Sequence, residues 1–252
     1  MEKNYFSGSV PDGIGKLQKL QELYLNENKF SGPTPSSQGN LTSLRKLFVS
    51  GTRFEGSIPP SLGNCQSLFA LDLSNNNLTG TIYTWRDSRN FIPSTLFGNN
   101  SLTGSSPYKV FDLVNPCGTR FIGNKLSDET PTTLGSCIML EPIYLEGNDF
   151  EGTIPQSIRS LRSLEEIDIS CNNLSGEITE FLGKFTLLNH LNLSYKEGIF
   201  SNASDLSIIV NDRLCGDLPK LCMHPQKVSF ISTTSCHKGE IAKRWNCNFT
   251  FV

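Results

Sequence analysis

The sequence predicts an α/β solenoid. In this fold, units of 24 residues stack with their strands in one parallel, concave β-sheet and with irregular or 3₁₀ segments on the convex side. Two observations predict it. A motif that ends in Phe/Leu-Ser-Gly returns at a constant interval, and pairs of apolar residues alternate with polar residues in the same register. Because so short a unit cannot bury its own apolar face, neighbouring units must cover it, and a curved stack results.

Glycine and proline encode the turn of each unit. The last position of the motif falls at Gly8, Gly32, Gly56, Gly80, Gly104, Asp128, Gly152 and Gly176. Proline stands three residues later in six of these eight copies. Glycine adopts backbone conformations that other residues resist, and proline removes a donor where regular strand pairing should stop. We therefore expect the strand to end here in each copy.

An asparagine stands four residues before the motif's last position in most copies. We expect it to turn inward and to bond backbone donors and acceptors that would otherwise lack partners. Thr52 takes its place in one copy. The predicted ladder consists of Asn28, Asn76, Asn100, Asn124, Asn148 and Asn172.

Each unit should also contribute one short strand with a single buried face, because its apolar residues alternate with polar ones. The apolar pairs are Leu23/Leu25, Leu47/Val49, Leu71/Leu73, Ile143/Leu145, Ile167/Ile169 and Leu191/Leu193. The residues between and beside them face the concave surface. Exposed aromatic residues next to charges are typical of binding surfaces, although most outward positions of a sheet are ordinary solvated ones. The candidate ligand-binding residues are Tyr24, Lys46, Phe48, Asp72, Tyr144, Glu146, Glu166, Asp168 and His190.

Two segments carry a family resemblance. LTSLRKLFVSGTRFEGSIPPSLGN, residues 41–64, resembles the repeat of plant leucine-rich-repeat receptor-like kinases, apart from Thr52. EGIFSNAS (197–204) and RLCGDLPKLC (213–222) resemble the end of the ectodomain in an immune-receptor subgroup that includes the rice bacterial-blight receptor and the elongation-factor receptor. The resemblance covers residues 1–222.

The resemblance implies a right-handed superhelix with a second, small sheet. It also implies an extracellular or plasma-membrane-associated glycoprotein that binds a peptide or protein in defence or developmental signalling. A shorter leucine-rich-repeat co-receptor kinase is the implied partner. The Ser/Thr kinase domain of such receptors is not expected in this chain, because the sequence has no Gly-rich phosphate loop, HRD or DFG motif.

The predicted organisation has three parts. Residues 1–195 hold about eight repeats, residues 196–222 a cap-like segment, and residues 223–252 a poorly ordered tail outside the repeat. Over residues 83–121 the repeat is degenerate: Arg86 and Arg89 stand in apolar columns, which predicts poor packing there. The chain begins within a repeat and without a cysteine-paired cap, so we expect a truncated ectodomain or an incorrectly spliced product.

Eight cysteines and seven Asn-x-Ser/Thr triplets favour a secretory origin, although the chain shows neither a secretion signal nor a membrane-spanning run. The triplets predict glycans at Asn40, Asn77, Asn99, Asn173, Asn192, Asn202 and Asn248.

The cysteines divide into three groups. Cys215 and Cys222 flank a short loop of the cap-like segment and predict a disulfide. Cys65 and Cys137 stand in a column otherwise held by leucine, which predicts buried free thiols. The pairing of Cys117, Cys171, Cys236 and Cys247 stays open.

Charge and motif spacing exclude other function classes. With 22 Lys and Arg against 24 Asp and Glu, and no basic stripe, nucleic acid is not an expected partner. No histidine shares a frame with Asp72-x-Ser74 or Asp168-x-Ser170, so no catalytic residues are expected. The Cys and His residues after position 214 lack the close pairs of zinc sites, so neither metal nor cofactor is expected.

The predicted function is therefore ligand recognition without enzyme activity. Two alternatives remain: a secreted leucine-rich-repeat inhibitor of cell-wall-degrading enzymes, and a truncated product without independent function.

Overall fold

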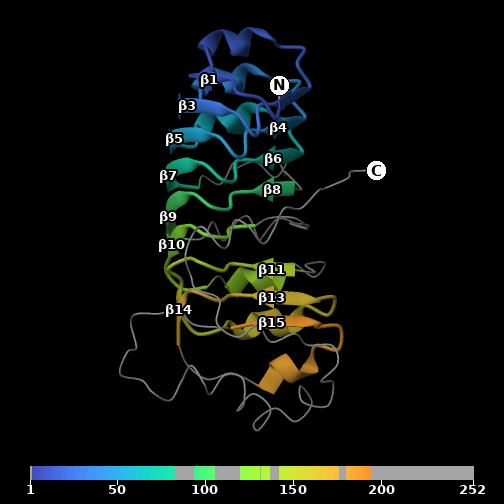
Figure 1. Cartoon of the computed structure of the whole chain (residues 1–252). Helices are drawn as coiled ribbons and strands as arrows, with labels where there is room; N and C mark the ends of the chain where they lie inside the picture. Colours follow the sequence, from blue (N-terminus) through green and yellow to red (C-terminus); the bar gives the residue numbers. More distant parts are fainter. Residues whose placement is uncertain are drawn as a thin grey trace, which may run out of the picture.

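The computed structural model describes residues 2–82, 94–105, 120–130, 132–136, 142–175 and 180–193. These residues stack into the predicted leucine-rich-repeat solenoid, which progresses from the amino terminus at one end to β15 near the other (Figure 1). The cap-like segment and the tail, with the predicted Cys215–Cys222 disulfide, lie outside the described residues.

The concave strands hold the apolar pairs in register. One parallel sheet has the order β2 (Glu22–Tyr24), β4 (Lys46–Phe48), β6 (Ala70–Asp72) and β8 (Ser94–Leu96), and another has β11 (Pro142–Tyr144), β13 (Glu166–Asp168) and β15 (His190–Asn192). A parallel bridge joins Leu96 to Arg120, and the N–H of Phe121 donates to the carbonyl of Tyr144 at 3.5 Å. The sequence predicts one concave sheet, whereas the described strands form two that these contacts connect.

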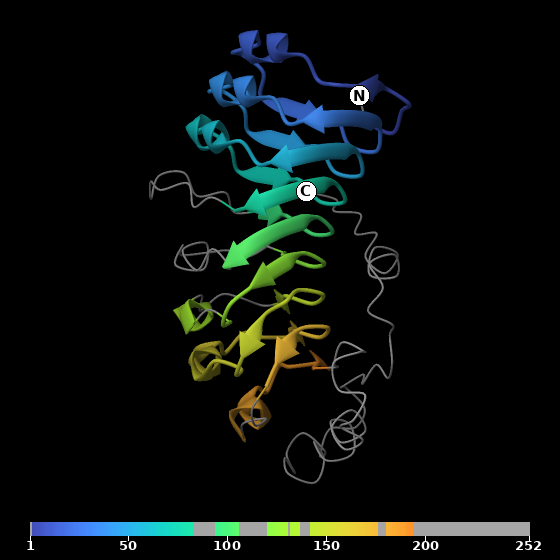
Figure 2. The same cartoon turned by 90° about the vertical axis from the view of Figure 1, so that its left-hand side faces the viewer.

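A second set of parallel strands flanks the concave sheets, and Figure 2 shows them side by side. Six belong to one sheet: β1 (Ser7–Gly8), β3 (Lys29–Pro33), β5 (Arg53–Ser57), β7 (Asn77–Thr81), β9 (Ser101–Ser105) and β10 (Lys125–Ser127). β12 (Glu151–Gly152) and β14 (Asn173–Leu174) form another. The expectation of a small second sheet is wrong, because the six-stranded flank is the largest sheet of the described part.

These flanking strands are made by the Phe/Leu-Ser-Gly motif itself. Its apolar residue points inward, and Phe54, Leu78 and Leu102 are fully buried. Its glycine takes a left-handed backbone conformation, with φ +81° at Gly32. Asp128 adopts φ +69° in the same column, so the turn keeps its shape where glycine is missing.

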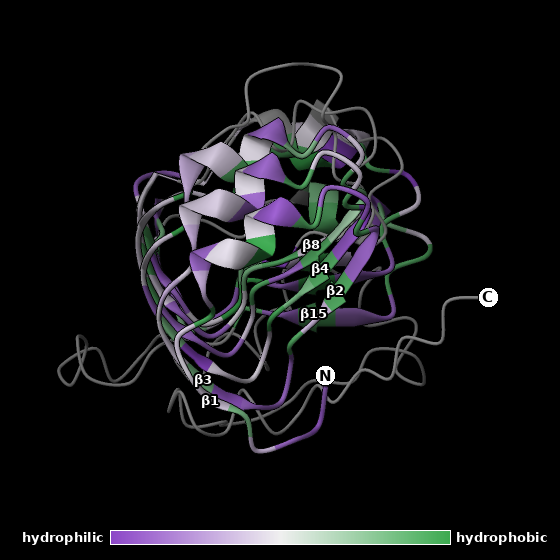
Figure 3. Ribbon diagram, turned by 90° about the horizontal axis from the view of Figure 1, so that it is seen from above, coloured by the Kyte–Doolittle hydropathy of each residue, from purple (hydrophilic) through white to green (hydrophobic). Residues whose placement is uncertain are grey.

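The convex side consists of short 3₁₀ helices, as the sequence predicts. They are η1 (Asp12–Lys16), η2 (Ser36–Asn40), η3 (Pro60–Asn64), η4 (Thr132–Ser136), η5 (Gln156–Ser160) and η6 (Glu180–Lys184). A proline precedes η1, η2, η3 and η5 with φ between -62° and -70°, which presets the backbone for the first turn. Figure 3, which looks down the stack, places these helices across the core from the concave strands.

The core runs without interruption along the described repeats, and it includes part of the degenerate stretch. Phe97 and Phe121 are buried to 1% and 0% exposure, and their rings stack at 5.6 Å with a 9° interplanar angle. Poor packing is therefore the wrong expectation for residues 94–105 and 120–130. Arg86 and Arg89, which prompted it, lie outside the described residues.

Buried asparagines tie consecutive repeats together. Asn76 donates from Nδ2 to the carbonyls of Val49 (2.9 Å) and Leu73 (3.1 Å), and its Oδ1 accepts the N–H of Phe54 (3.0 Å). The same inter-repeat bonds recur at Asn100, Asn124, Asn148 and Asn172. Asn28 accepts the N–H of Phe6 and donates to the carbonyl of Leu25. Thr52 stands in this column without a carboxamide. Its hydroxyl donates to the carbonyl of Val49 and to Asn76 Oδ1, so its contacts do not include the bond by which asparagine Nδ2 reaches the preceding repeat.

Candidate binding surface

Two groups of side chains occupy the concave surface. They come from the outward positions of the concave strands, where alternate residues leave the core. We call Glu22, Tyr24, Lys46 and Phe48 the amino-terminal cluster. The carboxy-terminal cluster consists of Arg120, Tyr144, Glu146, Glu166, Asp168, His190 and Asn192.

The amino-terminal cluster combines an ion pair with an aromatic pair. Lys46 Nζ lies 3.2 Å from Glu22 Oε1, and the Tyr24 hydroxyl donates to Glu22 Oε2 at 3.0 Å. The Tyr24 and Phe48 rings meet edge to face at 5.2 Å and 79°, a favourable aromatic geometry. The hydrogen bond from Lys46 lowers the pKa of Glu22, and burial raises the pKa of Tyr24. At neutral pH the cluster therefore holds one charge of each sign beside two half-buried rings.

Phe69 extends this cluster, and the sequence pattern does not identify it. The Arg45 guanidinium lies 5.3 Å and Lys46 Nζ 5.8 Å from the centre of its ring, which is within cation–π range. Phe69 precedes β6 by one residue, so the period-two alternation of the strand does not include it. The pattern therefore gave no signal for this residue.

Asp72 stabilises the turn that follows β6. Its Oδ1 accepts the N–H of Ser74 at 3.0 Å and the Ser74 hydroxyl at 2.6 Å. The carboxylate is half-buried on the concave side. The Asp-x-Ser pattern here is thus a turn-stabilising contact, because one carboxylate oxygen accepts both the backbone and the side-chain donor of Ser74.

The carboxy-terminal cluster is more deeply buried. The Tyr144 hydroxyl donates a hydrogen bond to Glu166, and the Arg120 guanidinium lies 4.8 Å from the centre of the Tyr144 ring. Burial raises the pKa of Tyr144, and the bond to Glu166 adds to this effect. Tyr144 and Glu146 are 6% and 4% exposed. Both were expected to face a ligand, but in this structure little of either side chain is accessible.

Asp168 links three neighbouring side chains. It accepts hydrogen bonds from the Ser170 hydroxyl at 2.6 Å and from Asn192 Nδ2 at 3.0 Å, and His190 Nε2 lies 4.0 Å from its Oδ2. The structure thus brings a histidine beside Asp168, which the sequence reasoning did not expect. The Ser170–Asp168 contact repeats the Ser74–Asp72 contact of an earlier repeat, so it belongs to the turn that each of these repeats makes.

Exposure separates the nine candidate residues into two sets. Tyr144, Glu146 and Asp168 are buried. Tyr24, Lys46, Phe48, Asp72, Glu166 and His190 are half-buried and retain surface for a ligand. The accessible candidates therefore lie on both clusters and, with Asp72, on the sheet between them.

The predicted glycan acceptors differ in their surroundings. Asn40, Asn77 and Asn173 are exposed. Asn99 donates from Nδ2 to Asn75 at 2.9 Å, and buried Asn192 uses the same atom to bond Asp168 and Ser170, at 3.0 and 3.1 Å. In those two residues the nitrogen that would carry a glycan is already bonded. Asn202 and Asn248 lie outside the described residues.

The two described cysteines differ in state. Cys65 is free and buried, as predicted, and burial raises the pKa of its thiol to about 11. Cys171, whose state the sequence left open, is disulfide-bonded. Cys117, Cys137, Cys236 and Cys247 lie outside the described part of the chain.

Within that part, no three His, Cys, Asp or Glu residues gather closely enough to hold a metal ion. The helices of the described residues also lack the length and the apolar composition of a transmembrane span.

Comparisons with known proteins agree with the fold. The Leucine Rich Repeat family pattern matches residues 19–41, 43–65, 67–85 and 163–185. The Arabidopsis receptor kinase HAESA, solved in complex with the peptide hormone IDA and the co-receptor SERK1, is similar at 33% identity and a TM-score of 0.67, over 77% of this chain and 33% of HAESA. The plant peptide hormone receptor RGFR1, solved with RGF2, is similar at 31% identity and a TM-score of 0.65, over 77% and 35%.

A plant ice-binding protein is also similar, at 27% identity and a TM-score of 0.64, over 78% of this chain and 63% of that one. No curated protein sequence matches the chain. The chain spans about a third of the length of the two receptor structures. It therefore has the leucine-rich-repeat solenoid fold of plant receptor ectodomains, a fold that also serves a protein of different function.

Proposed function

We propose that this leucine-rich-repeat solenoid is a ligand-recognition scaffold that binds a peptide on its concave surface, as the extracellular part of a plant receptor-like kinase in immune or developmental signalling. The amino-terminal cluster is the observation that carries the proposal. It sets two half-buried aromatic rings beside a cation and an anion on a rigid sheet, which is the composition typical of interface anchors.

The geometry of the surface favours an extended peptide over a compact small molecule. The accessible residues run from Tyr24 on β2 to His190 on β15, along the length of the described stack. An extended chain can reach such separated contacts, with successive ligand residues meeting the side chains of successive repeats.

The similar receptors support the choice of ligand and partner. HAESA was solved with a peptide hormone and a co-receptor, and RGFR1 with RGF2. We propose by analogy that a shorter leucine-rich-repeat co-receptor kinase joins the complex. A secreted or plasma-membrane-associated setting fits the disulfide at Cys171, because disulfides persist in oxidising compartments.

The test is direct capture followed by measured affinity. The chain, secreted from plant cells, is immobilised and exposed to a mixture of secreted plant peptides, and the retained peptides are identified by mass spectrometry. A synthetic copy of each is then titrated against the protein and against Phe48→Ala. We expect the substitution to weaken binding by tenfold or more, about 1.4 kcal/mol, because an anchor ring is lost.

Tyr5→Ala is the matched control. Tyr5 is an aromatic residue at 84% exposure outside both clusters, so its loss should leave the affinity unchanged. Equal binding by the protein and by Phe48→Ala would reject the concave surface as the site. Tight inhibition of a pectin-degrading enzyme, with no peptide retained, would favour the inhibitor alternative.

A further inference from the structure

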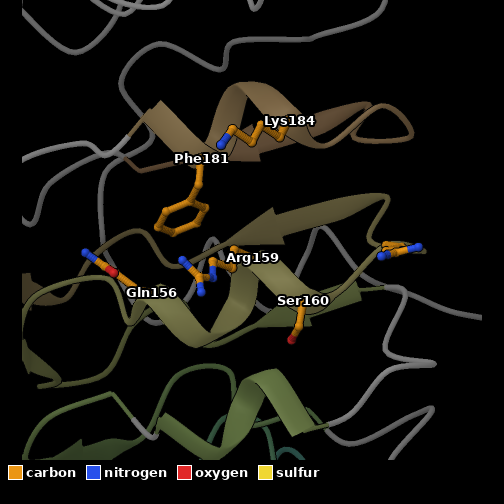
Figure 4. Close-up of a pocket in the computed structure, with 6 residues that line it drawn as sticks. Gln156, Arg159, Ser160, Phe181 and Lys184 are labelled. Carbon is orange, nitrogen blue, oxygen red and sulfur yellow. The ribbon is translucent and has the colours of Figure 1, made fainter.

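A pocket opens on the convex side between η5 and η6, away from the concave surface. Its volume is about 570 Å³, within the range of small-ligand sites. The lining residues are Gln156, Arg159, Ser160, Arg162, Phe181 and Lys184. In Figure 4 Phe181 points from η6 toward η5, where Arg159 and Gln156 lie. We call this the η5–η6 pocket.

The repeat columns explain why the stack opens here. In earlier repeats a glycine of one 3₁₀ helix touches a serine of the next. A Cβ at Gly39 would lie 2.4 Å from the carbonyl oxygen of Ser61, and one at Gly135 would lie 2.1 Å from that of Ser157. Only glycine permits so close an approach.

Both partners of that contact are replaced in the following repeat. Arg159 stands 24 residues after Gly135, and Phe181 stands 24 residues after Ser157. Two large side chains cannot occupy the space of a glycine–serine contact, so η6 is held away from η5 and both residues line the resulting pocket.

The pocket carries positive charge that the described residues do not neutralise. Arg159, Arg162 and Lys184 are exposed cations. Within the part of the chain that the structure describes, Arg159, Arg162 and Lys184 form no ion pair. Three cations around one opening, unpaired among the described residues, attract an anion and disfavour a neutral or cationic ligand.

The remaining lining groups suit a sugar. Gln156 offers a carboxamide donor and acceptor to hydroxyl groups, and Phe181 provides an apolar wall. The guanidinium groups of Arg159 and Arg162 have the planar fork that pairs with a carboxylate or sulfate group. We propose that the η5–η6 pocket binds an acidic saccharide, a sugar unit that carries a carboxylate or sulfate.

The experiment is isothermal titration of the full chain with two probes, a diuronic acid and a disulfated disaccharide. Inorganic sulfate, a neutral disaccharide and hexaglutamate are the reference ligands. We expect both acidic saccharides to bind at least tenfold more tightly than any reference ligand. Binding should also weaken as salt rises, because exposed charges are screened.

Three variants test the assignment of residues. Arg159→Gln, Arg162→Gln and Lys184→Gln each remove one charge but keep a long side chain, so η6 stays held away from η5. Each should weaken saccharide binding by about threefold to tenfold. Lys19→Gln, which removes an exposed cation outside the pocket, should leave it unchanged. Circular dichroism checks that each variant is folded.

Two results would overturn the assignment of an acidic saccharide to this pocket. If the Lys19 variant loses as much affinity as the pocket variants, bulk charge and not the pocket binds the saccharide. Equal or tighter binding of inorganic sulfate or of hexaglutamate overturns the assignment to a saccharide. The concave variant Phe48→Ala should bind the saccharides normally, which keeps this test separate from that of the peptide site.

Discussion

Single residues determine how well each repeat packs on the next, and Gln38 is a polar residue that its place in the core does not satisfy. It occupies the convex apolar column held by Leu62 in the next repeat and is 1% exposed. Its Oε1 and Nε2 have no hydrogen-bond partner among the described residues. An unsatisfied buried carboxamide costs stability, since water satisfies it in the unfolded chain.

We therefore expect Gln38→Leu to raise the free energy of unfolding by about 1 to 3 kcal/mol. Urea unfolding followed by circular dichroism measures it. The same substitution at the exposed residue Gln66 should change stability by less than about 0.5 kcal/mol. A destabilised Gln38→Leu protein would mean that the amide has a role in the fold that the structure does not reveal.

Asn124 is the opposite case, a buried polar residue whose carboxamide nitrogen and oxygen both have hydrogen-bond partners. Its Nδ2 donates to the carbonyls of Phe97 and Phe121, both at 3.1 Å, and its Oδ1 accepts the N–H of Leu102 at 3.1 Å. Asn124→Ala leaves these backbone groups buried and unpaired, so we expect a loss of about 2 to 4 kcal/mol in urea unfolding. Asn64→Ala, at an exposed site without a predicted glycan, is the control, and equal losses would contradict the ladder's role.

Cys65 offers a test by chemical reactivity. Its thiol is 3% exposed and donates to the carbonyl of Gln38 at 3.3 Å. Burial disfavours the thiolate and raises the pKa to about 11, so the folded protein holds the unreactive thiol at pH 8. Iodoacetamide at pH 8 should leave Cys65 unmodified by mass spectrometry until urea unfolds the chain. Rapid labelling of the folded protein would contradict the buried position.

At the scale of elements, the spacing between 3₁₀ helices depends on glycine. Gly39→Ala places a Cβ 2.4 Å from the backbone oxygen of Ser61, and a backbone atom cannot move away cheaply. We expect a loss of about 1 to 3 kcal/mol in unfolding free energy. Gly13→Ala is the matched control in η1, where no atom lies within 4 Å of the added Cβ. It should be neutral or stabilise by up to about 1 kcal/mol.

The regular elements are also where the sequence was most informative. Apolar alternation identifies β2, β4 and β13 because one face of each strand is buried, and the proline column locates the start of η3 and η5. The second sheet was underestimated, because its strands carry a glycine-containing motif that is typical of turns. The alternation also could not show that Tyr144 and Glu146 are buried, since it reports the direction of a side chain and not what covers it.

The candidate site was recovered only in part for the same reason. Outward positions such as Tyr24 and Phe48 follow from strand phase, but the contact of His190 with Asp168 depends on side-chain rotamers. The η5–η6 pocket needed coordinates as well. The sequence shows that Arg159 replaces the glycine of this column. Whether a pocket results depends also on Phe181 in the following repeat.

For the whole molecule, stability is approximately a sum over neighbouring repeats. The contact between η5 and η6 lacks the close glycine–serine packing of earlier repeats, so the last described repeat should open more readily. We expect amides in residues 180–193 to exchange hydrogen faster than those in residues 36–50, as measured by mass spectrometry. Equal protection of both segments would mean that the pocket does not weaken the stack.

The asparagine ladder also limits how a gene for such a protein can change in length. Asn76 bonds backbone groups 22 and 27 residues earlier in the chain, and Asn172 repeats both separations. Duplicating or excising 24 residues, or a multiple of 24, restores both separations wherever the boundaries fall. A change of any other length leaves buried groups facing the wrong partners. Recombination should therefore add or remove whole repeats. The concave surface can then lengthen or shorten during evolution while the core of the remaining repeats stays unchanged.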